Sequence, residues 1–231
     1  GKDFILAHAS ADTSALATAM VRGAFEYQGQ KCSAASRCYI PQSIWDEVKE
    51  KYLEQVNNIQ VGDVNDFSKF MNAVIDETSF DNIVNYIKYT KKSSEAKIIS
   101  GGGYDKIKGY FVEPTTILTT NAYFKTMKEE IFGPVLTIYV YDESWDNICS
   151  IVDSTSPYGL TGAIFAHDEK VIASGKRMLA QSAGNFYIND KPTGAVVGQQ
   201  PFGGSRASGT NDKAGSPLNL YRWGPLRTIK E

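Results

Sequence analysis

A cysteine on a loop that begins with glycine is the residue best placed for chemistry in this chain of 231 residues. Cys32 follows residues 29–31 (GQK) directly after a predicted helix, so we expect it on a loop that a substrate can approach. Only the thiolate is a nucleophile and a free thiol has a pKa of about 8.5, so Cys32 needs activation by a cation or by backbone amides. Lys31 and local N–H groups are candidates. A packed, unreactive side chain is the alternative.

Two further segments could border a cofactor or a substrate. Residues 130–134 (EIFGP) place a carboxylate that could accept hydrogen bonds from a ribose, and a ring that could stack on a flat cofactor. Residues 201–204 (PFGG) combine an aromatic ring with flexible backbone, which is typical of a loop that closes over a substrate. Taken singly, each also fits an ordinary turn. Cys38, in a predicted strand, and Cys149, in a predicted helix, are interpreted as structural.

Composition bounds the class of protein. An apolar content of 42% supports a sizeable core, and the formal charge of -2 is spread over both signs without long runs. The three cysteines show neither CxxC nor Cys/His spacing. We therefore expect a soluble, globular chain of one large domain or two small ones, with no disulfide, no metal site, no nucleic-acid partner and no membrane segment.

Predicted helices alternate with predicted strands along the chain. Apolar periodicity indicates helices near 10–27, 43–56 and 81–91, from 145 and after 168, and strands near 37–41, 97–99, 111–118, 135–141, 161–165 and 185–188. We expect Ser43 to cap the second helix. Such alternation predicts an α/β fold with a mostly parallel sheet, helices on both faces and ligands beyond the carboxyl ends of the strands.

The last residues form a separate unit in this interpretation. We predict a domain over residues 1–216 and a tail over 217–231. The tail is predicted to contain a final strand at 219–229, in a segment where prolines and glycines interrupt regular structure. Little in this tail resembles a core. The strand either lies at the edge of the same sheet or pairs across a subunit boundary.

Taken together and in order, residues 29–32, 130–134 and 201–204 resemble the nucleophile, cofactor and late-loop motifs of the aldehyde dehydrogenase superfamily. More narrowly, other segments resemble the branch that oxidises glutamate γ-semialdehyde, the open form of Δ1-pyrroline-5-carboxylate, to glutamate in proline catabolism. These segments are residues 25–27, 109–114, 158–162, 184–191 and 208–213. The resemblance covers nearly the whole chain.

The resemblance implies a role for each motif residue. Cys32 would be the catalytic nucleophile, forming a thiohemiacetal and then a thioester, with NAD as the hydride acceptor. Glu130 and Phe132 would bind NAD. The residues that would bind the aldehyde substrate are Lys31, Ser33, Gly194, Ala195 and Phe202. Ala195 stands where the branch often has a serine. The resemblance also implies a homo-oligomer, in the mitochondrial matrix of a eukaryote or the cytoplasm of a bacterium.

Two family features are expected outside this chain. The general base of the family lies in a Glu-x-Gly-Gly-Lys motif, whose last two residues match Gly1 and Lys2. The N-terminal NAD-binding domain has no counterpart here. We therefore expect a catalytic domain of a longer enzyme that is inactive alone, with Glu26 a surface or packing residue rather than a substitute base. The alternatives are a non-catalytic assembly module, a thioesterase acting through Cys32, and an aldehyde dehydrogenase of another semialdehyde specificity.

Overall fold

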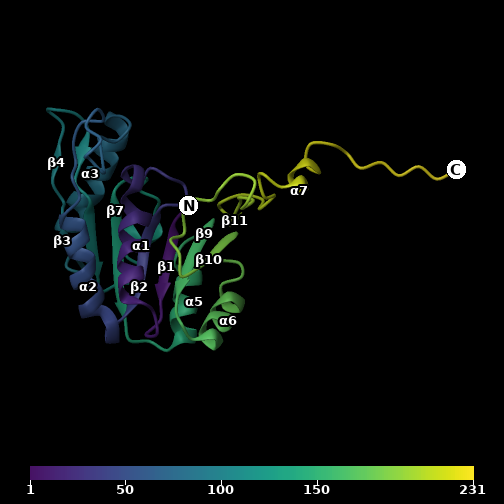
Figure 1. The fold of residues 1–231 in the computed structure, drawn as a ribbon, viewed down its shortest axis with the longest axis horizontal. Coiled ribbons are helices and arrows are strands. Elements are labelled where there is room, and N and C mark those ends of the chain that lie inside the picture. The colour runs from purple at the N-terminus through teal and green to yellow at the C-terminus, as the bar shows by residue number, and fades with distance from the viewer.

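The computed structural model describes residues 1–231, which form a seven-stranded sheet between two layers of helices (Figure 1). The strand order is β10-β9-β1-β2-β7-β6-β3, and every neighbouring pair is parallel except β3 and β6. The strands of this sheet are β1 (Asp3–Ala7), β2 (Ala35–Pro41), β3 (Ala96–Ser100), β6 (Thr115–Thr119), β7 (Val135–Tyr141), β9 (Thr161–Phe165) and β10 (Asn185–Ile188). The mostly parallel α/β fold predicted from the sequence is confirmed.

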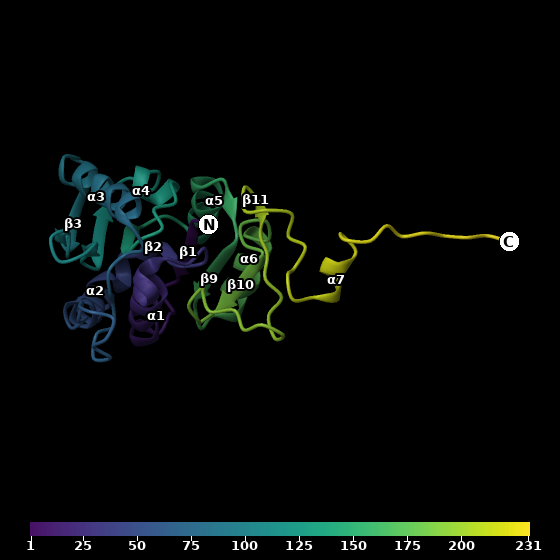
Figure 2. The same cartoon turned by 90° about the horizontal axis from the view of Figure 1, so that it is seen from above.

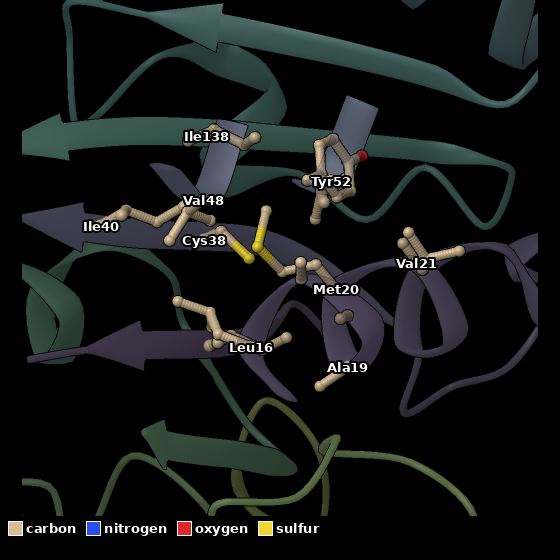
Figure 3. Packing of buried hydrophobic residues seen from close by; sticks show 14 of the residues in the cluster. Leu16, Ala19, Met20, Val21, Cys38, Ile40, Val48, Tyr52 and Ile138 are labelled. Carbon is tan, nitrogen blue, oxygen red and sulfur yellow. The ribbon is translucent and has the colours of Figure 1, made fainter. Parts of the chain in front are cut away.

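Helices cover both faces of the sheet (Figure 2). The helices are α1 (Thr13–Phe25), α2 (Gln42–Asn57), α3 (Glu77–Lys91), α4 (Lys125–Lys128), α5 (Trp145–Thr155), α6 (Glu169–Met178) and α7 (Pro217–Leu220). The core has a layer of buried apolar side chains on each face of the sheet. Because side chains alternate across a strand, Ile5 of β1 packs in the layer under α1 and α2, whereas Phe4 packs in the layer under α5. Figure 3 shows Cys38 directed from β2 into the first of these layers, toward Met20. No helix has the length and apolar character to span a bilayer.

Three elements of the structure differ from the sequence prediction. The strand β1 was not predicted, because its four successive apolar residues, Phe4 to Ala7, show no alternation that would mark a strand. The helix α2 begins at Gln42, directly after β2, with Pro41 at its N-cap and no side-chain cap, so the prediction of Ser43 as the cap is wrong. Pro114 divides the strand predicted at 111–118 into β5 (Phe111–Val112) and β6.

The tail does not join the sheet. The strands β10 and β3 are the sheet edges, residues 217–220 form the short helix α7, and residues 224–231 extend away from the body (Figures 1 and 2). The interpretation of the tail as an edge strand of the same sheet is therefore wrong. Pairing across a subunit boundary stays a prediction. The exposed large apolar side chains of the tail are Leu218, Leu220, Tyr221, Trp223, Leu226 and Ile229.

Candidate active site

The loop that carries Cys32 leaves α1 through a tight left-handed turn. Tyr27, Gln28 and Gly29 have φ values of 54°, 56° and 64°, which reverse the chain between α1 and β2. A Cβ atom at Gly29 would lie 2.4 Å from the carbonyl oxygen of Gly133. Only glycine allows this approach, so the position explains how the cysteine loop comes to lie against the segment 130–134.

Two glutamines brace this loop against residues 72–75. The side chain of Gln28 donates to the carbonyl of Ala73 (3.3 Å) and accepts from the N–H of Asn72 (3.2 Å). The side chain of Gln30 accepts from the N–H of Ile75 (2.8 Å). Cys32 lies between Gln30 and the start of β2 in sequence. Its side chain is exposed, and its backbone N–H donates to no other protein group.

A cavity of about 670 Å³ adjoins the thiol and brings most of the predicted site residues together. It is lined by Cys32, Phe132 and all the residues predicted to bind substrate, which are Lys31, Ser33, Gly194, Ala195 and Phe202. The sequence interpretation gave no role to six further lining residues, the first of which lies within the nucleophile motif: Gln30, Thr193, Val197, Gln200, Ala214 and Gly215. Most of these adjoin a motif residue in sequence, which was the available signal.

The site lies at the amino ends of the strands, not at the carboxyl ends. Cys32 precedes β2, Phe132 precedes β7, and Gly204 approaches Leu160 just before β9. The prediction that ligands sit beyond the carboxyl ends is therefore wrong for this cavity. The reason is that the loops leading from helices into strands, together with the segment that returns after β10, supply the lining residues.

The segment after β10 presents open backbone to the cavity. Gly194 has φ +93°, and the N–H groups of Gly194 and Ala195 donate to no protein acceptor. The side chain of Gln200 accepts from the N–H of Val196 (2.9 Å), which closes the turn. A second hydrogen bond connects this segment to the cysteine loop: the hydroxyls of Ser33 and Thr193 lie 2.8 Å apart.

Hydrogen bonds of its own backbone and of the nearby Lys213 hold the loop of Phe202 in place. Its backbone exchanges two hydrogen bonds with Ala214 (2.9 and 2.8 Å). The ammonium of Lys213 donates to the carbonyl oxygens of Gly184 (2.5 Å) and Gly203 (3.1 Å) and to the side chain of Asn185 (3.3 Å). No carboxylate pairs with this cation, and burial lowers the pKa of Lys213. The ammonium therefore fixes the loop through neutral oxygen atoms.

The side chain of Lys31 forms a salt bridge with Glu26. Its ammonium lies 2.9 Å from one carboxylate oxygen of Glu26, and Arg22 lies 2.5 Å from the other. Partial burial acts to raise the pKa of Glu26, but the hydrogen bonds from Lys31 and Arg22 hold it below its ordinary value. A carboxylate held by two cations is a poor proton acceptor, so the geometry favours a structural role for Glu26.

Glu130 borders a neighbouring hollow instead of the main cavity. It lines a pocket of about 20 Å³ together with Phe132 and Lys31, which belong to both spaces. The carboxylate of Glu130 is 30% exposed, while Phe132 has φ +59° and keeps 47% of its surface exposed. An accessible carboxylate beside an accessible ring fits a ribose and a flat ring.

The other two cysteines lie in the packed interior. Cys38 on β2 and Cys149 on α5 are fully buried, and burial raises the pKa of both thiols, that of Cys149 to about 12. Neither therefore forms a thiolate near neutral pH. No group of three or more His, Cys, Asp or Glu side chains is arranged to hold a metal ion.

Nearly the whole of this chain matches a known family, and all of it aligns with individual members of that family. The model of the aldehyde dehydrogenase family matches residues 1–223. The chain is 57% identical over 232 residues to a mitochondrial Δ1-pyrroline-5-carboxylate dehydrogenase of Dictyostelium discoideum, with 100% of this chain and 42% of that protein covered. It is 49% identical over 233 residues to the human mitochondrial enzyme of the same name, covering 100% of this chain and 41% of that one.

Solved structures agree with the sequence comparison. The Δ-pyrroline-5-carboxylate dehydrogenase of Mycobacterium tuberculosis bound with NAD superposes with a TM-score of 0.90 at 47% identity, covering 99% of this chain and 42% of that one. The NAD-bound 1-pyrroline-5-carboxylate dehydrogenase from Thermus has a TM-score of 0.87 at 34% identity, covering 96% and 42%. The chain thus spans about two fifths of the length of the relatives that it matches.

Proposed function

Because the chain belongs to the aldehyde dehydrogenase family, we propose that it is the nucleophile-bearing part of an NAD-dependent enzyme that oxidises glutamate γ-semialdehyde to glutamate. One observation carries the proposal: the exposed thiol of Cys32 lies in the cavity that Ser33, Gly194, Ala195 and Phe202 line. The names of the relatives in the previous subsection support the choice of substrate. This activity belongs to proline catabolism.

In the first chemical step the thiolate of Cys32 attacks the aldehyde carbon. A carbon–sulfur bond forms, and the electron pair of the carbonyl moves to oxygen, which becomes an oxyanion. The free backbone N–H of Cys32 can donate to that oxyanion. Loss of a hydride from the same carbon leaves a thioester, and attack by water then releases the carboxylate and the thiol.

The residues opposite the thiol suit the amino-acid end of the substrate. The free N–H groups of Gly194 and Ala195 can donate to its α-carboxylate, and so can the hydroxyl of Ser33. Phe202, whose backbone is fixed by Ala214, packs beside the methylene groups. The main chain thus supplies two of the donors, which compensates in part for the methyl group of Ala195.

The segment 130–134 fits the nicotinamide end of NAD. Glu130 would accept hydrogen bonds from the ribose hydroxyls, and the exposed ring of Phe132 would pack on the cofactor. When bound, NAD supplies the acceptor for the hydride. We assign the water-activating base to no residue of this chain, since Glu26 is occupied by Lys31 and Arg22.

We also propose the division of the chain and its setting. Residues 1–216 form the catalytic domain, and the exposed apolar side chains of residues 217–231 join subunits of a homo-oligomer. The names of the Dictyostelium discoideum and human relatives include the word mitochondrial, which supports the mitochondrial matrix for a eukaryotic source. A bacterial source would place the protein in the cytoplasm.

A comparison of two cysteine variants tests the proposed activity. The full-length protein and its Cys32→Ala and Cys38→Ala variants are supplied with glutamate γ-semialdehyde and NAD, and NADH formation is followed. We expect turnover by the wild type and Cys38→Ala and none by Cys32→Ala. Turnover that survives loss of Cys32 would contradict the proposal, and so would a wild-type protein that oxidises only aldehydes without an amino-acid end.

A further inference from the structure

A buried pair of hydroxyls joins two parts of the cavity wall that are 160 residues apart in sequence. The Oγ atom of Ser33 and the Oγ1 atom of Thr193 lie 2.8 Å apart, and the two residues are only 7% and 3% exposed. Ser33 directly follows the nucleophile, and Thr193 directly precedes Gly194. The contact therefore ties the cysteine loop to the segment that would hold the carboxylate.

These two side chains are the only hydroxyls among the residues that line the cavity. Ala195 offers a methyl group, and the remaining polar side chains in the lining are Gln30, Lys31 and Gln200. Gln30 is bonded to the N–H of Ile75, Lys31 to Glu26 and Gln200 to the N–H of Val196. Both glutamines accept these bonds through their amide oxygens, so their N–H groups remain available as donors, and the hydroxyl pair is the donor group that directly adjoins Cys32 and Gly194 in sequence.

The pairing leaves one hydroxyl proton for a ligand. Two hydroxyls carry two protons, and one of these is used in the bond between them. If Thr193 donates to Ser33, the proton of Ser33 is free to donate to a carboxylate, and the chain of two bonds strengthens both. If Thr193 is absent, the hydroxyl of Ser33 rotates without a fixed partner.

We infer that Thr193 is a positioning residue that orients the hydroxyl of Ser33 toward the α-carboxylate of the substrate, and thereby sets the preference for an amino-acid aldehyde over a plain one. This inference rests on the proposed function. Thr193 acts through Ser33 and has no contact with the reacting carbon in this account. Its effect is expected on substrate binding, not on the chemistry at Cys32.

Steady-state kinetics of the full-length protein with two aldehydes test the inference. The substrates are glutamate γ-semialdehyde and pentanal, which has a similar length but no amino-acid end. Thr193→Val, which keeps the shape and removes the hydroxyl, should raise the KM for the semialdehyde about three- to tenfold, the size expected for one hydrogen bond. Its kcat, and its KM for pentanal, should stay within about twofold of the wild type.

Two further variants separate orientation from packing. Thr193→Ser restores the hydroxyl and should restore the KM for the semialdehyde. Ser33→Ala combined with Thr193→Val should be no worse than Ser33→Ala alone, because Thr193 acts only through Ser33. Should Thr193→Val fail to fold, Thr193→Ala replaces it with the same expectations.

Several outcomes would overturn the inference. An unchanged KM for the semialdehyde in Thr193→Val would do so, as would an equal rise for both aldehydes or effects of Ser33 and Thr193 that multiply. A wild-type protein that oxidises pentanal but not the semialdehyde would overturn the proposed function, and the inference with it. Failure of Thr193 alone, with the semialdehyde still preferred by the wild type, would leave the proposed function standing.

Discussion

Cys32 and Cys38 are six residues apart in sequence and have opposite surroundings. Cys32 is exposed on a loop held open by left-handed residues at 27–29, beside a cavity of about 670 Å³. Cys38 is fully buried on β2 between α1 and the sheet, where burial raises its pKa. The difference teaches that the backbone before β2, more than the thiol itself, decides which sulfur can meet a substrate.

The largest effect on activity should come from removing the exposed thiol, compared with removing a buried one. In the full-length protein, Cys32→Ala should lower kcat for aldehyde oxidation by at least about 10³-fold, because no other side chain in the cavity can replace the nucleophile. Cys149→Ala, the matched control in the interior, should keep kcat within about twofold and lower the free energy of unfolding by about 1 kcal/mol. Loss of activity in both variants would remove the distinction between the thiols.

A smaller effect is expected from the residue that fixes the far wall of the cavity. Lys213→Met keeps the side-chain stem but removes the ammonium that binds the carbonyls of Gly184 and Gly203. Phe202 then loses its support, and kcat/KM for the semialdehyde should fall about tenfold, equivalent to about 1.4 kcal/mol. The rate at which Cys32 reacts with iodoacetamide should not change. A fall in that rate would show that Lys213 acts on the thiol itself.

The pH dependence of stability should reveal the buried thiols. In the unfolded chain a thiol loses its proton near pH 9, whereas in the fold Cys149 keeps its proton to about pH 12. Between these values the unfolded state binds fewer protons, so the free energy of unfolding falls as the pH rises. Partly buried tyrosines such as Tyr139, whose pKa is raised to about 12 by desolvation and by its hydrogen bond to Glu143, add to the decline.

Urea titrations at several pH values between 8 and 11, roughly the range in which the thiol of the unfolded chain titrates, measure this slope. Cys149→Ala should make the decline shallower than it is in the wild type. An unchanged slope in Cys149→Ala would mean that the fold does not protect Cys149 from ionisation.

The smallest effect should follow from restoring a hydroxyl to the cavity. Ala195→Ser adds a donor beside the free N–H groups of residues 194 and 195. A net gain of about 0.5 to 1 kcal/mol for one hydrogen bond predicts a KM for the semialdehyde lower by about two- to fivefold. The KM for pentanal serves as the control and should not move. A higher KM for the semialdehyde would indicate that the methyl group of Ala195 packs against the substrate.

The sequence allowed the fold class to be predicted, but not the end of the sheet at which the site lies. Alternating periodicity identified β2, β7, β9 and β10, because each has a clear apolar run. The strand β1 is as long as β9, but it stands at the start of the sequence with no preceding helix to alternate with. The position of the cavity at the amino ends depends on how residues 189–204 return along the molecule, which no local pattern encodes.

The same limit applies within the site. Cys32 and Phe202 stood out because a thiol beside glycine and a ring beside two glycines are unusual local patterns. Thr193 and Lys213 did not stand out, since threonine and lysine are common and their roles arise from contacts with residues 160 and 29 positions away. Their assignment needed the three-dimensional structure.

Peptide mapping after brief alkylation tests the central claim most directly. The native chain is exposed to iodoacetamide, quenched, digested and analysed by mass spectrometry, with a sample unfolded in urea as the reference for full labelling. We predict that Cys32 is labelled in the native chain while Cys38 and Cys149 react only after unfolding. An unlabelled Cys32, or equal labelling of all three cysteines in the native chain, would contradict the assignment of Cys32 as the accessible nucleophile.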